Sequence, residues 1–174
     1  MTGRPPFHRL AAALFLLCGP ALAAAAPVAP DQNAGGRAQV VKPAVLQKLN
    51  DLDFGAVFVP NASGTLTINP NTEALTTTGA VIFAGGSPHS ARFEAVSPTK
   101  TVVIIRAPRQ PATLTRVGGT ETMRVDNWTI SGQARRTVAA QEPFSFNIGG
   151  TLYVGANQAE GTYTGTFDVE IQYP

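Results

Sequence analysis

The chain has 174 residues, of which 44% are hydrophobic and 14% are charged, and it contains 17 Gly, 14 Pro and one Cys. This composition excludes a disulfide-stapled miniprotein, a collagen-like or coiled-coil fibre and a highly charged disordered chain, because each needs a compositional bias that is missing here. One ordinary domain remains, with a formal net charge of +2.

Residues 1–23 have the layout of a secretory signal peptide. Arg4 and Arg9 give a basic start, Leu10–Cys18 is apolar, and Ala21-Leu22-Ala23 offers a small-residue cleavage site, although the cut could fall as late as residue 26. The apolar stretch is too short for the roughly 20 residues that span a bilayer. We therefore expect an exported protein, periplasmic, cell-surface or extracellular, with no membrane span after processing.

Removal of this leader changes the charge and the redox prediction. Arg4 and Arg9 leave with it, so 11 basic and 11 acidic residues remain, and Arg135-Arg136 is then the only adjacent cationic pair. Nucleic-acid binding needs clustered cations, so we expect no nucleic-acid partner. Cys18 also leaves, and the domain must then be stable without a disulfide.

Residues 24–37 are rich in Ala, Pro and Gly and predict a flexible arm before a domain over residues 38–174. A short helical turn is expected near Pro43 to Leu49. From Gln39 onward, apolar runs recur every eight to twelve residues between Gly, Pro, Asn and Asp. This spacing predicts an all-β fold, an antiparallel β-sandwich of immunoglobulin-like type.

Alternation predicts several strands in chain order. The first strand should carry one apolar face, made of Leu52, Phe54, Ala56 and Phe58. Shorter strands should follow at Gly64–Ile68, at Val81 and Phe83, and at Phe93 and Ala95. Val102–Ile105 is apolar on both faces and predicts a central strand covered on both sides. Leu114 between threonines predicts a further strand.

The next strands carry two finer predictions. The apolar parity changes between Val125 and Trp128, so a bulge is expected at Asp126-Asn127. The even positions from Phe144 to Val154 stay apolar through Gly149-Gly150, which predicts one long strand instead of a hairpin. Tyr153 has the opposite parity, so its ring should be partly exposed and its hydroxyl should reach a polar partner.

The C-terminal segment shows the cleanest alternation. After a turn over residues 156–161, apolar residues occupy one face: Tyr163, Gly165, Phe167, Val169, Ile171 and Tyr173. As one strand it would run about 35–40 Å at about 3.3 Å per residue.

These motifs carry a resemblance. Leu52-Asp53-Phe54-Gly55, the Gly64–Ile68 strand, Phe146–Leu152 and Gly161–Phe167 resemble the secreted bacterial family of domain of unknown function 4402 over about residues 38–174. The C-terminal segment is also similar to that of chaperone–usher pilus subunits, with a penultimate Tyr173 and with Gly161 as the fourteenth residue from the end.

The pilus resemblance implies a sandwich that lacks one strand and accepts it from a neighbouring surface-protein subunit by strand addition. The candidate assembly strand then comprises Gly161, Tyr163, Phe167, Val169, Ile171 and Tyr173. A donor segment needs alternating apolar residues, and the arm offers only Ala38 and Val40, with Val41 out of register. A complete, self-contained sandwich is the alternative.

Catalytic and metal sites find little support. His89, the single histidine after the leader, lies in a turn with Ser87 and Ser90, and no third residue orients it. Acidic and amide residues near Asp51 and Asn69 fit solvated turns better than a calcium loop. We expect no cofactor and no catalysis. The expected role is a structural or interaction protein, with a secreted binding module for carbohydrate or protein as the alternative.

Overall fold

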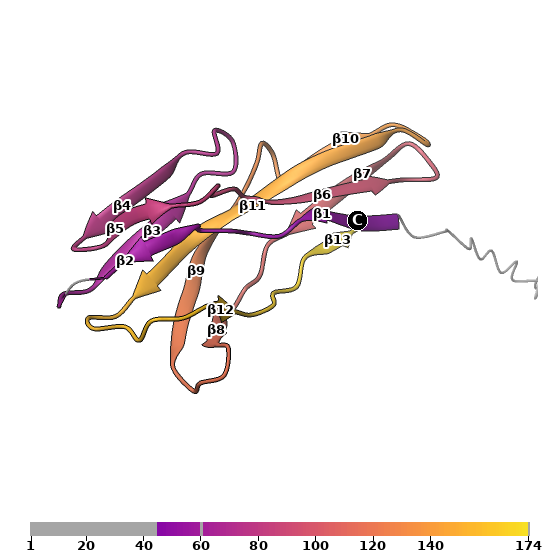
Figure 1. Cartoon of the computed structure of the whole chain (residues 1–174). Coiled ribbons are helices and arrows are strands. Elements are labelled where there is room, and N and C mark those ends of the chain that lie inside the picture. Colours follow the sequence, from indigo (N-terminus) through magenta and orange to yellow (C-terminus); the bar gives the residue numbers. More distant parts are fainter. Residues whose placement is uncertain (1–44, 60, 174) are drawn as a thin grey trace, which may run out of the picture. The chain divides into compact units, whose positions relative to one another are not determined.

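The structure is a computed structural model that describes residues 45–59 and 61–173 (Figure 1). The predicted signal peptide 1–23, the arm 24–37 and residues 38–44 lie outside the described residues. The described chain is all-β: it contains thirteen strands and no helix. The predicted antiparallel β-sandwich is confirmed.

The largest sheet has eight antiparallel strands. Their order is β1-β6-β11-β9-β8-β12, and β3 and β4 join beside β11. The strands are β1 (Val45–Asn50), β3 (Gly64–Ile68), β4 (Leu75–Gly79), β6 (Ala91–Val96), β8 (Ala112–Arg116), β9 (Thr122–Ile130), β11 (Pro143–Val154) and β12 (Tyr163–Thr164).

Two smaller sheets complete the fold. One has the order β10-β7-β13, with β7 (Thr101–Arg106) between β10 (Arg135–Val138) and β13 (Glu170–Gln172). The other is the ribbon of β2 (Ala56–Phe58) and β5 (Ile82–Gly85). β7 is the central strand of its sheet, as predicted, with Val103 and Ile105 buried, but Val102 and Ile104 on its other face are only half-buried.

Strand β11 pairs with three other strands and runs along the large sheet without a turn (Figure 1). Its first half pairs with β6, and its second half pairs with β9 on one side and β3 on the other. Gly149 makes this possible, because a Cβ there would collide with the carbonyl oxygen of Ile68 and with the ring of Pro70. The predicted single long strand is confirmed.

The predicted bulge is also confirmed. The register between β9 and β11 shifts between Gly149 and Thr151, and Asn127 has a φ of 51°, in the left-handed region. The extra residue in β9 changes which side chains point into the core, from odd-numbered positions before the bulge to even-numbered positions after it. Val125 is therefore buried before the bulge, and Trp128 after it packs against the core.

The core has two buried clusters between the sheets, and Leu52, Trp128 and Phe167 pack against both. The first cluster contains Phe54, Leu66, Ile68, Val81, Ala112, Val125, Leu152 and Val154. The second contains Ala91, Phe93, Ile105, Phe146 and Ile148, with the rings of Phe93 and Phe146 stacked at 5.5 Å between centroids.

Two predictions near the first strands are wrong. Residues 45–50 form strand β1, paired with β6, and not a helical turn. The alternation from Leu52 to Phe58 is broken at Gly55, whose φ of +73° turns the chain. Phe54 therefore faces the core, whereas Phe58 is 60% exposed and Val57 packs inward in its place. Phe83 of β5 is likewise 38% exposed, although Val81 is buried as expected.

The predicted single C-terminal strand is also wrong. Its alternation holds only in part: Tyr163, Phe167, Val169 and Ile171 are half-buried, but Gly165 and Tyr173 are exposed. Only β12 and β13 are strands, and residues 165–169 connect them. β12 pairs with β8 and β13 with β7, so the segment passes from one sheet to another. The connection from β7 to β8 faces these residues across a cavity and contains Pro108 and Pro111, which have no amide hydrogen to donate to a ladder.

Candidate functional site

A groove of about 570 Å³ lies between residues 52–59 and residues 158–163. Half-buried apolar side chains line it: Leu52, Val57, Val59, Leu114 and Met123. All five pack against the first core cluster. The groove is therefore a place where side chains that pack on the core reach the surface.

The two strands that flank the groove have unpaired edges. In the part of the chain that the structure describes, β2 pairs with β5 alone and β12 pairs with β8 alone. Main-chain donors and acceptors on such an edge can pair with another extended segment. In the described residues, the groove thus lies beside two strands that each have one edge without a strand partner.

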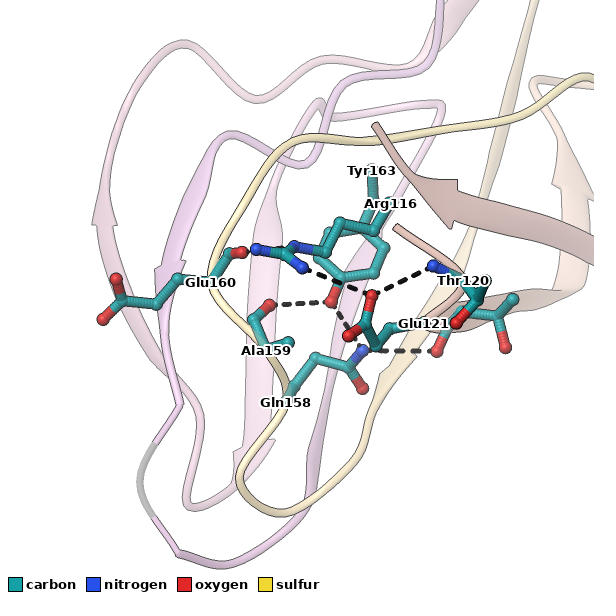
Figure 2. A network of polar contacts seen from close by, with 8 residues as sticks. Arg116, Thr120, Glu121, Gln158, Ala159, Glu160 and Tyr163 are labelled. Carbon is teal, nitrogen blue, oxygen red and sulfur yellow. Dashed lines mark hydrogen bonds and ion pairs between the residues drawn. The ribbon is translucent and has the colours of Figure 1, made fainter. Parts of the chain in front are cut away.

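Tyr163 fixes the turn at the end of the groove (Figure 2). Its hydroxyl donates a hydrogen bond to the Ala159 carbonyl oxygen at 2.7 Å and accepts one from Gln158 Nε2 at 2.8 Å. Gln158 Nε2 also donates to the Thr122 carbonyl oxygen at 3.3 Å, which ties the turn to β9. A tyrosine bonded back to the main chain a few residues upstream is a recurring anchor in immunoglobulin-like sandwiches.

Gly161 has both steric and conformational reasons to be glycine. Its φ is +146°, and a Cβ there would lie 2.8 Å from Arg116 Nε. That nitrogen donates a hydrogen bond to the Glu160 carbonyl oxygen at 2.6 Å. Arg116 Nη1 lies 3.4 Å from Glu121 Oε2 (Figure 2). The backbone amide of Glu121, followed by Arg116, lowers the pKa of the Glu121 carboxyl.

The structure brings only part of the predicted assembly strand to the groove. Gly161 and Tyr163 line it. Phe167, Val169 and Ile171 are half-buried and pack against the second core cluster, and Tyr173 is 38% exposed. The five apolar lining residues were not predicted as a site. Their sequence signal is ordinary core alternation, which does not distinguish a covered position from one that lies open.

A second cavity, of about 490 Å³, lies further along the C-terminal segment. It separates the connection 107–111 from residues 166–170, and its lining mixes apolar side chains with charged ones of both signs. Arg106 Nε donates to Gln172 Oε1 at 2.5 Å beside it. The cavity lies beside residues 165–169, which form no strand.

The candidate catalytic residues do not form a nucleophile–base pair. His89 Nδ1 lies 2.7 Å from the Ser87 carbonyl oxygen, and Ser90 Oγ donates to Glu73 Oε1 at 2.6 Å. Asp53 and Asn69 each accept a hydrogen bond from the amide two residues later, as in solvated turns. Within the described ranges no group of three His, Cys, Asp or Glu residues could hold a metal ion.

The fold and the groove define an all-β sandwich with an exposed section of its core between β2 and β12. The chain belongs to the family described as domain of unknown function DUF4402, whose model matches residues 45–173. No curated protein and no solved structure matches the chain. In the described residues, no helix has the length and apolar character needed to cross a membrane.

Proposed function

We propose that this protein is an exported, non-catalytic structural or interaction protein of the bacterial cell surface or periplasm, a pilus-like subunit that joins its partners by strand addition. The observation that carries the proposal is the groove, where half-buried core residues lie between β2 and β12, each of which pairs on one edge in the described residues. The predicted signal peptide over residues 1–23 supports export.

Strand addition suits this geometry for a physical reason. An extended segment that pairs with the open edge of β2 or of β12 would satisfy main-chain groups there and place every second side chain against apolar residues of the groove. Burial contributes roughly 25 cal/mol for each Å² of apolar surface removed from water. Neither contribution needs a catalytic residue.

Deletion of residues 24–41 tests this function. The full chain should form oligomers in size-exclusion chromatography with light scattering, and the deletion should leave monomers. Replacement of residues 27–36 by Gly and Ser of equal length is the matched control and should keep the oligomers. A full chain that is monomeric at every concentration, or oligomers that persist without residues 24–41, would contradict the proposal.

A self-contained binding module is the second candidate, and the outer face of the large sheet favours it. One register row crosses five strands through Thr78, Thr65, Tyr153, Arg124 and Thr113. The Tyr153 hydroxyl lies 2.7 Å from Asn127 Nδ2, as the sequence predicted for a partly exposed tyrosine. A monomeric full chain retained on immobilised polysaccharide, with retention lost in Tyr153→Ala, would favour this candidate.

A further inference from the structure

The groove carries negative charge at its rim. Asp53 and Glu160 are the two charged residues among those that line it, and both are exposed. The Glu160 carboxylate points away from Arg116 (Figure 2). The hydrogen bond from Arg116 to Glu160 goes to the main-chain carbonyl oxygen and not to the carboxylate. A segment that enters the groove therefore gains from cationic residues beside its apolar ones.

One segment of the chain outside the described residues has this chemistry. Residues 37–42 read Arg-Ala-Gln-Val-Val-Lys, with a cation at each end and Ala38 and Val40 on one face of an extended strand. Six extended residues span about 17 Å, the length of an ordinary strand. The preceding residues 24–36 contain one acidic residue, Asp31, and no cation. Charge and alternation thus coincide at residues 37–42.

We propose that the groove binds residues 37–42 of a second copy of the chain. This inference rests on the proposed function and names the partner and the segment. Ala38 and Val40 would face Leu114 and Met123 on the groove floor, and Arg37 and Lys42 would lie near the acidic rim.

Chain length explains why the segment comes from a second copy. Residues 43 and 44 alone separate Lys42 from Val45, so Lys42 lies within about 11 Å of the start of β1. β1 spans about 17 Å before the groove begins near Leu52. If the chain reversed at Pro43, residues 37–42 would run back along β1 of their own copy, and Val40 would reach only about the middle of β1, short of the groove.

The contact is head-to-tail, because the donor segment and the groove are different surfaces. Each copy that donates its residues 37–42 keeps its own groove open for the next copy. A heterologous contact that does not close on itself builds an open chain of subunits. A closed two-fold dimer would instead need both copies to exchange segments at once.

Disulfide trapping between two full chains tests the proposal. Every chain carries Cys18→Ser, which removes the natural cysteine. One chain carries Val40→Cys, and the other, with a tag of different size, carries Leu114→Cys in the groove. Mild oxidation should give the mixed dimer, because a disulfide needs Cβ atoms about 3.5–4.5 Å apart.

Matched controls use the neighbouring residues. Thr113→Cys lies next to Leu114 but on the outer face of β8, and Gln39→Cys has the opposite parity to Val40. Both should trap much less mixed dimer. Equal trapping at Thr113 and Leu114 would overturn the proposal, since an unspecific collision would explain it. A chain with both Val40→Cys and Leu114→Cys that closes on itself in dilute solution would also overturn it.

The acidic rim gives an independent measurement. Glu160→Lys should reduce the yield of the mixed dimer about two- to fivefold, the range for one exposed ion pair, and Glu160→Gln should have a smaller effect. An unchanged yield in Glu160→Lys would overturn the charge argument. Oligomers that require residues 24–41 but never trap at Leu114 would overturn this inference and leave the proposed function standing, whereas a strictly monomeric full chain would overturn both.

Discussion

Tyr163 is the residue that attaches the turn before the C-terminal segment to the large sheet. Its hydroxyl bonds Ala159 and Gln158, and its ring is half-buried. In Tyr163→Phe the Ala159 carbonyl oxygen and the Gln158 amide lose a partner. We expect the free energy of unfolding, measured by urea denaturation, to fall by about 1–2 kcal/mol.

Tyr153→Phe is the control for this change. Its hydroxyl lies near one exposed partner, Asn127, and the Arg124 guanidinium carbon lies 4.3 Å from the centroid of its ring. The phenylalanine ring keeps the stacking, so the loss should stay below about 1 kcal/mol. A larger loss in Tyr153→Phe than in Tyr163→Phe would contradict the assigned role of Tyr163.

Glu73 gives the domain an acid-sensitive contact. Its carboxylate accepts hydrogen bonds from the amide and hydroxyl of Ser90 and from Asn147 Nδ2. Partial burial works to raise the pKa of Glu73, but these hydrogen bonds, with a smaller effect of His89, outweigh it and lower the pKa below its ordinary value. The charged carboxylate therefore stabilises the fold above the pKa of the unfolded chain.

Glu73→Gln should expose this dependence. The stability that Glu73 contributes is present above about pH 5 and is lost as the pH falls through the lowered folded pKa. The difference in unfolding free energy between the natural chain and Glu73→Gln should thus shrink between about pH 5 and pH 3. Glu142→Gln, at an exposed position, is the control. A difference that stays constant over this range would contradict the role of the charge.

Among the elements, β11 depends most on a single glycine. A Cβ at Gly149 would collide with the Ile68 carbonyl oxygen and with Pro70. Gly149→Ala should lower the free energy of unfolding by about 1–3 kcal/mol, the usual cost of overpacking. Gly155→Ala, just past the strand end, meets only the end of the Gln158 side chain at 3.3 Å and should cost little. Equal losses in urea denaturation would contradict this account of the strand.

The same elements show what alternation can predict. Strands β3, β6 and β11, and the bulge in β9, follow from period-two patterns, whereas β7 follows from a continuous apolar run. The alternation gave a wrong prediction where the backbone turned, and where the extent of a strand depended on its pairing partners. Gly55 reversed the parity before Phe58, and the terminal alternation did not reveal that its pairing partner changes from β8 to β7.

The groove could not be predicted for a related reason. Gly161 and Tyr163 stood out in the sequence through a resemblance, but Leu114 and Met123 read as covered core residues. Whether a core position is covered depends on which strands lie beside each other, and the groove lies between β2 and β12, which are far apart in the sequence. Tertiary topology, and not local pattern, exposes these side chains.

At the scale of the whole molecule, an open groove makes stability depend on association. An occupant that binds only the folded domain stabilises it in proportion to the logarithm of its concentration. When the occupant belongs to another copy, the concentration that matters is that of the protein itself. A groove filled in this way would therefore link the thermal stability of each domain to the number of its neighbours.

This link predicts a melting temperature that rises with protein concentration. For the full chain, each tenfold increase should add up to about 1.4 kcal/mol of apparent stability once the groove is largely filled. The chain without residues 24–41 should melt at one temperature at all concentrations, because it retains the groove and lacks the donor. Scanning calorimetry at several concentrations measures both. A full chain whose melting temperature ignores concentration would show that the domain is stable without a neighbour.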